Sequence, residues 1–148
     1  MTSQASRYGL VLLMMLVGAI NATQAPINAG LSRRSGLVAA VTASFVVGTV
    51  LMLVLALLTR SDLTAVRGAP PWQFMGGFTA VVFITATAFL VPRIGLAAVI
   101  AANVAAQLIA GMAIDKYGLF GLERIQVSWV RVAGGVVLLA GALMVAKK

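Results

Sequence analysis

The sequence predicts an all-α integral membrane protein whose single transmembrane domain, residues 1–148, crosses the bilayer five times. Two observations support this prediction. Hydrophobic residues make up 61% of the chain and charged residues only 9%, a balance well outside the usual range of soluble domains. The few charges also lie between long apolar blocks, which indicates helical spans with charged ends.

The charged residues set the limits of the predicted helices. Three uncharged stretches of 25 residues and one of 21 follow one another between residues 8 and 114. The last stretch, residues 132–146, would be about 22 Å long as a helix, which is short for a hydrocarbon core of about 30 Å. It can be extended back past Arg131, whose long side chain can reach the membrane surface. The predicted helices are therefore approximately residues 8–31, 36–59, 71–91, 94–114 and 126–146.

The start of the first predicted helix imitates a cleavable signal sequence. Arg7 is followed by an apolar run and then by Ala-Thr-Gln-Ala. However, Pro26 comes directly after that cleavage-like site, and the apolar character resumes beyond it. We therefore expect this segment to remain in place as the first membrane span.

The charge balance and the missing residue types exclude several functions. The chain holds eleven basic and three acidic residues, a formal net charge of +8. Because the basic residues are spread between the apolar blocks, we expect them to anchor the protein in the lipid bilayer and not to bind nucleic acid. Cys and His are absent, and no glycine-rich phosphate loop is present. We therefore expect no enzyme activity, no metal and no cofactor.

Five spans place the two ends of the chain on opposite sides of the membrane, and the basic residues are almost equally divided between those sides. Six lie on the N-terminal side and five on the other: Arg7, Arg60, Arg67, Lys116, Arg124 and Arg131 against Arg33, Arg34, Arg93, Lys147 and Lys148. A Lys/Arg bias normally sets orientation. Either the first helix fixes one topology, or the chain inserts both ways. In the second case inverted copies could pair into a ten-helix antiparallel homodimer, with the inverted symmetry found in many transporters.

Three carboxamides lie in the first predicted helix, beside a proline. Asn21, Gln24 and Asn28 are spaced i, i+3 and i+7, so they share one face of a continuous helix. Pro26 has no N–H and its ring would clash with the carbonyl of Ala22, which predicts a kink there. The amides either bind neighbouring helices to one another or line a substrate cavity. Three on one face favour the cavity.

Other polar residues extend the candidate substrate site. Asn103 and Gln107 share one face of the fourth predicted helix, and they either line a cavity or bond to another helix. Trp72 and Thr79, seven residues apart in the third, are further candidates. The alternative for Trp72 is an anchor at the membrane surface, and for Thr79 a hydrogen bond to its own helix.

Residues 70–118 resemble the third and fourth helices of the YdcZ-type family of small inner-membrane proteins, within the drug/metabolite transporter (DMT) superfamily. The most specific part is AAQLIAGMAID, residues 105–115, with Gln107, Gly111 and Asp115. The C-terminal GGVVLLAGALMVAKK is similar to the family's last helix. This resemblance, which extends over essentially the whole chain, implies a multi-pass protein of the bacterial inner membrane, a transport role, and a paired or dual-topology arrangement with a DMT-like fold.

The last predicted helix carries no polar side chain from Val132 to Ala146. Gly134, Leu138 and Gly141 lie on nearly one stripe, which indicates a packing face. The helix is similar to the glycine-heptad helix that joins two protomers in the small multidrug exporters. We therefore predict that these three residues form the dimer interface, with packing inside one protomer as the alternative.

These observations leave two functions open. The first is a secondary transporter, an exporter of a small polar or amphipathic solute, that works by alternating access as a dual-topology homodimer. The second is a membrane partner that transports nothing and assembles or regulates a larger complex. The orientation of the amides distinguishes them, because a transporter directs the amides toward a shared cavity and a structural partner directs them into contacts between helices.

Overall fold

The computed structural model describes residues 4–146, with side chains from Tyr8 onward. Over this range the chain is helical, and five segments are long and apolar enough to cross a membrane, which confirms the predicted number of spans. Two compact units are formed, one ending at Pro92 and one beginning at Arg93. The side chain of Arg7, and Lys147 and Lys148, which the charge balance includes, lie outside the described residues.

The first span consists of two helices, where the sequence predicted one over residues 8–31. α1 (Gln4–Ala22) ends just before Thr23, and α2 (Gln24–Ser35) follows it. The break lies where Pro26 would interrupt the helical hydrogen bonds, because proline excludes the carbonyl four residues earlier. Thr23 partly replaces the interrupted helical hydrogen bonds. Its N–H and its hydroxyl both donate to the carbonyl of Ile20, at 3.1 and 2.7 Å.

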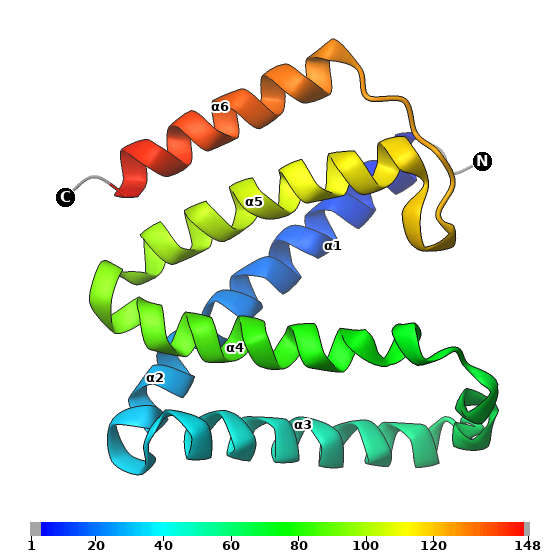
Figure 1. Ribbon diagram of the computed structural model, residues 1–148, viewed down its shortest axis with the longest axis vertical. Helices are drawn as coiled ribbons and strands as arrows, with labels where there is room; N and C mark the ends of the chain where they lie inside the picture. The colour runs from blue at the N-terminus through cyan, green and yellow to red at the C-terminus, as the bar shows by residue number, and fades with distance from the viewer. Residues whose placement is uncertain (1–3, 147–148) are drawn as a thin grey trace. The chain divides into compact units, whose positions relative to one another are not determined.

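A single glycine joins α2 to α3 (Leu37–Leu58). Gly36 has φ 83° and ψ 157°, a backbone conformation that only glycine adopts readily. Its N–H donates to Ser32 O at 2.9 Å, and its carbonyl accepts from Ala40 N at 3.1 Å. The two helices turn back on each other at this point (Figure 1) and bury small side chains between residues 28 and 41.

The remainder of the first unit leads from α3 into α4. Two short 3-10 helices, η1 (Leu63–Gly68) and η2 (Pro71–Phe74), precede α4 (Met75–Ile94). Asp62 begins η1 by accepting hydrogen bonds from the hydroxyl and the N–H of Thr64, at 2.7 and 2.9 Å, and these bonds lower the pKa of Asp62. α4 continues past Pro92 to Ile94, three residues beyond the predicted end of this span.

In the second unit, α5 (Leu96–Tyr117) packs beside α6 (Trp129–Ala146) (Figure 1). Gly95, with φ 87° and ψ 152°, starts α5 two residues later than predicted. Gly118 ends it in the left-handed conformation, φ 63° and ψ 41°, three residues later than predicted. Gly135 of α6 is buried, and a Cβ built on it would lie 3.0 Å from Met112 Cε.

The segment of residues 118–128 connects these two helices through η3 (Leu119–Gly121). It returns toward α5, since Ile125 N donates to Asp115 O at 2.9 Å. The prediction that the last helix begins at residue 126 was wrong, because the hydroxyl of Ser128 accepts from Arg131 N at 3.3 Å and caps a helix that begins at Trp129. α6 therefore has 18 residues, four fewer than α3 or α5.

Candidate functional site

The most deeply buried polar side chain that the structure describes is Asn28, which is 2% exposed. It lies on α2 where this helix faces α3, and the hydroxyl of Ser44 donates to its Oδ1 at 2.5 Å. The Nδ2 position has no hydrogen-bond partner in the described part of the chain. Because turning the amide over only exchanges its oxygen and nitrogen, either orientation leaves one polar atom unpaired. Leaving such a group unpaired costs about 1–3 kcal/mol, so Asn28 is expensive as a purely structural residue.

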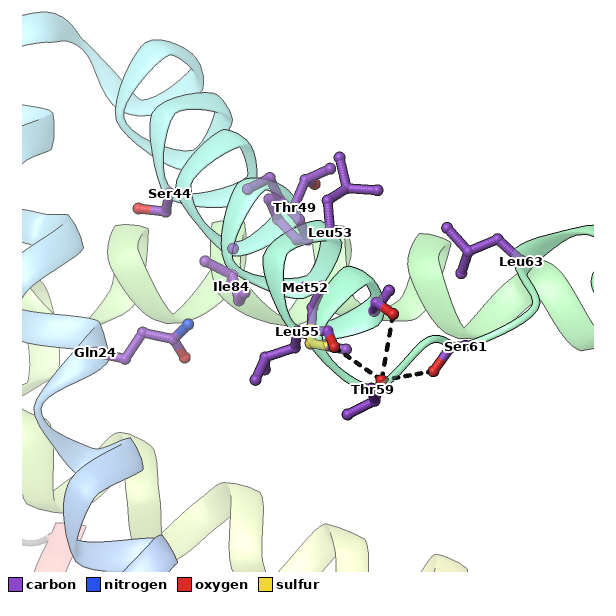
Figure 2. Close-up of a pocket in the computed structure, with 13 residues that line it drawn as sticks. Gln24, Ser44, Thr49, Met52, Leu53, Leu55, Thr59, Ser61, Leu63 and Ile84 are labelled. Atoms are coloured by element: carbon purple, nitrogen blue, oxygen red, sulfur yellow. Dashed lines mark hydrogen bonds between the residues drawn. The ribbon is translucent and has the colours of Figure 1, made fainter.

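Gln24 lies one turn before Asn28 on α2 and lines a groove of about 790 Å³ in the first unit. Figure 2 shows its side chain pointing from α2 toward the residues of α3. The lining contains no charged residue. Its polar members are Gln24, Ser44, Thr49, Thr59 and Ser61.

Hydrogen bonds inside the protein occupy only part of this polar lining. The hydroxyl of Thr59 bonds to Leu55 O and to the hydroxyl of Ser61, both at 2.8 Å (Figure 2). In contrast, the carboxamide of Gln24 and the hydroxyl of Thr49 bond to no other described residue. The groove therefore offers a ligand uncharged donors and acceptors within a largely apolar surface.

The break at Thr23 changes the predicted amide face. Gln24 and Asn28, four residues apart, share a face of α2, whereas Asn21 is an exposed residue at the end of α1. The three amides are therefore divided between α1 and α2, with Gln24 and Asn28 together on α2.

The second unit has its own polar stripe along α5. Gln107 donates to Asn103 Oδ1 at 3.1 Å, so these two amides bond to each other on one helix. Gln107 also lines a groove of about 350 Å³ between α5 and α6, to which Asp115 and Arg131 contribute. Arg131 and Asp115 form an ion pair at 3.1 Å.

Trp72 and Thr79 take no part in the lining of the 790 Å³ groove. Trp72 is half-exposed in η2. The hydroxyl of Thr79 donates to Gly76 O at 2.9 Å, within its own helix, which was the alternative considered for this residue.

The glycines of α6 divide between two faces. Gly134 is exposed and Gly141 is half-buried, and a Cβ on either would meet nothing within 4 Å. Gly134 and Leu138 line the α5–α6 groove. Gly135, one residue further on, makes the close approach to α5, and sequence reasoning did not single it out. The proposed role of Gly134, Leu138 and Gly141 between protomers remains a prediction.

Ser44 and Thr49 line the groove but were not among the residues selected from the sequence. One signal could have identified Ser44. Asn28 and Ser44 lie eight residues before and eight residues after Gly36. In a tight helical hairpin, positions equally distant from the turn tend to lie opposite each other, so a polar pair at this spacing is a candidate contact.

Five apolar helices with uncharged polar side chains at their contacts define a multi-pass integral membrane protein. Residues 9–144 match the family described as "Putative inner membrane exporter, YdcZ", and the chain belongs to this DMT_YdcZ family. Both the YdcZ resemblance and the location in the inner membrane are thereby confirmed. Among curated proteins and solved structures, none matches the chain. The family description points to export and not to catalysis.

Proposed function

We propose that the protein is a secondary transporter that exports a small, uncharged polar or amphipathic solute by alternating access. Asn28 is the observation on which this rests most. A membrane protein that needed only helix contacts would gain little from an amide with one unpaired atom, since interhelical hydrogen bonds average about 0.6 kcal/mol. Its partner Ser44 lines the groove, and Gln24 presents a second amide to it one turn away.

The chemistry of the lining supports an uncharged solute. A buried cation or anion needs a countercharge, and none of the groove residues carries a charge. Amides and hydroxyls do not titrate near neutral pH. A solute with an apolar body and one or two hydroxyl, carbonyl or amide groups would satisfy Gln24 and Thr49, which line the groove.

Dual topology and an antiparallel homodimer are part of the same proposal. The near-equal division of basic residues, six against five, supports insertion in both orientations. Two inverted copies would make ten helices with two grooves facing opposite sides, an arrangement suited to alternating access. The open glycines of α6, Gly134 and Gly141, leave room for a second backbone and support contact there.

Flux measurements in liposomes test the transport proposal. A thermal-shift screen of uncharged amphipathic solutes on the purified protein first supplies a substrate. Gln24→Leu should lower its flux about tenfold or more, because it removes a hydrogen-bonding group worth about 1.4 kcal/mol to the bound solute. Gln73→Leu, the same change at an exposed residue outside the groove, is the control. Lowered Tm with unchanged flux per folded protein would show that the amides only hold helices together.

Reporters at the C-terminus test the topology. The wild-type chain should place its C-terminus on both sides of the membrane in comparable amounts. Two arginines added beside Arg33 and Arg34 should shift the population toward one orientation. A wild-type reporter found on one side only would contradict dual insertion, whatever the flux results.

One contact favours the second function, that of a non-transporting membrane partner. The bond between Asn28 and Ser44 joins α2 to α3, as expected if the amide serves helix assembly. In that case Asn28→Leu lowers Tm, no solute in the screen binds, and a second membrane protein copurifies in fixed ratio. Substrate flux that is lost in Gln24→Leu excludes this alternative.

A further inference from the structure

The second unit contains a pocket of about 840 Å³ at the end of α5 and the start of α6. The segment of residues 118–128 closes one side of it. Its walls include Met112 and Val132 at the apolar end, and Lys116, Tyr117, Arg124 and Trp129 at the other. Because the uncharged stretch of α5 ends at Ile114, this pocket lies where the span meets the membrane surface.

The pocket is positively charged. Lys116 and Arg124 line it, and within residues 8–146 neither forms a salt bridge. The Lys116 Nζ lies 5.5 Å from the centroid of the Tyr117 ring. Of the nearby carboxylates, Asp115 is paired with Arg131, and Glu123 lies next to Arg124 in sequence but outside the lining. Two cations and no carboxylate therefore face this space.

The backbone holds Arg124 at this place. The left-handed Gly118 reverses the chain, and the bond from Ile125 N to Asp115 O brings the segment back to α5. A Cβ on Gly118 would lie 2.7 Å from Arg124 Cγ, so the arginine stem rests directly on the glycine. The second cation is thereby positioned by the fold beside Lys116 and is not a freely solvated loop residue.

The surroundings fit a lipid. Trp129 is 87% exposed and Tyr117 is 59% exposed, and exposed aromatic rings at the end of a span usually lie among lipid headgroups. Below them the pocket is apolar. Basic pockets between helices at the membrane surface are suited to the phosphates of anionic lipids. We propose that Lys116 and Arg124 bind the phosphate of an anionic phospholipid, whose acyl chain lies along Met112 and Val132.

Lipid-dependent stabilisation of the full-length protein in detergent tests this proposal. Short-chain phosphatidylglycerol should raise Tm by about 3 °C or more, because it binds only the folded protein. Short-chain phosphatidylcholine and inorganic phosphate should raise it much less. Lys116→Gln combined with Arg124→Gln should remove the difference between the two lipids. Arg33→Gln combined with Arg34→Gln, with the same loss of charge at another helix end, should retain it.

Three outcomes would overturn the proposal. These are equal shifts with both lipids, a full shift with phosphate alone, and equal loss of the shift in both double variants. If the Lys116/Arg124 variant does not fold, Trp129 provides a second measurement, since Trp72→Phe leaves it as the one tryptophan of the chain. Brominated phosphatidylglycerol should then quench its fluorescence more than brominated phosphatidylcholine at equal mole fraction. Equal quenching contradicts the site.

Discussion

The two helical hairpins, α2–α3 and α5–α6, are joined in opposite ways. One glycine, Gly36, turns α2 directly into α3, whereas eleven residues, 118–128, connect α5 to α6. The tight turn fixes which residues of α2 and α3 lie opposite each other. The long connection leaves α5 and α6 to be aligned by their own contacts, chiefly the close approach of Gly135 to Met112.

The hairpins also differ in the polar contact that links their helices. The buried Asn28 and the half-buried Ser44 form a neutral contact about 12 Å along the helix from Gly36, near mid-membrane depth. Asp115 and Arg131 form a charged contact at the helix ends, and their side chains are 31% and 44% exposed. A charge at the membrane centre costs about 2.5–3.5 kcal/mol or more. The difference shows that burial depth selects the chemistry of the contact.

The largest effect is expected from breaking the tight turn. Gly36→Ala should lower the free energy of unfolding by about 1–3 kcal/mol, because alanine adopts this backbone conformation only with strain. Gly95→Ala should do the same, since its φ and ψ are nearly identical. Gly30→Ala, in the helix and in open space, is the control and should cost nothing. Denaturant unfolding in mixed micelles measures the free energy of unfolding of all three variants. A Gly36→Ala protein as stable as the Gly30→Ala control would contradict the role of the turn.

The second prediction separates the two glycine faces of α6. Gly135→Leu should destabilise the fold by about 1–3 kcal/mol, since the added side chain meets Met112. A Cβ on Gly141 would meet nothing within 4 Å, so Gly141→Leu should change the melting of the monomer much less than Gly135→Leu does and should lower the dimer fraction. Gly77→Leu, also in open space, is the control for dimerisation. Crosslinking in detergent gives the dimer fraction, and the same fraction for Gly141→Leu and Gly77→Leu would argue against this interface.

A double-mutant cycle sharpens the contrast between the polar contacts. Asn28→Ala and Ser44→Ala should show a coupling energy of about 0.6 kcal/mol, and no more than about 1.7. Because the contact is buried and uncharged, its coupling should not depend on salt. Denaturant unfolding of the four proteins at low and high salt measures this. Zero coupling would mean that the two residues act independently.

The smallest effect is expected at the ion pair. Asp115→Asn and Arg131→Gln should be coupled by about 0.2–1 kcal/mol, since both side chains are partly exposed. In contrast to the buried pair, this coupling should fall as salt rises from low ionic strength. The same four-protein cycle checks it. Salt-independent coupling would show that the pair is more shielded from water than its exposure indicates.

The number of spans could be predicted because charges are too costly in the bilayer to lie anywhere but between them. The predicted positions of the helix ends were less accurate, since each end depends on an individual capping residue. Gly95 and Gly118 set the two ends of α5, and Ser128 sets the start of α6. Each is a residue type that commonly caps helices. Pro26 correctly predicted an interruption of the first span, but its form, one residue at Thr23 between α1 and α2, depends on local hydrogen bonds.

The candidate site was only partly accessible from the sequence. Composition identified Gln24 and Asn28, because carboxamides are unusual in an apolar span. Their surroundings depend on how each helix is rotated, which composition does not specify. The adjacent glycines Gly134 and Gly135 illustrate this limit, since neighbouring helical residues point about 100° apart and Gly135 is the one that approaches Met112 of α5 closely.

The 18 residues of α6 have a consequence for the surrounding lipid. As a helix they measure about 27 Å, against about 33 Å for the 22 residues of α3 or α5. If the longer helices do not tilt, a membrane of uniform thickness cannot match both lengths and thins beside α6, at a cost in elastic energy. Two copies that bring their short helices together share one thinned patch and reduce that cost. The bilayer itself would therefore favour association at α6, more strongly as its thickness increases.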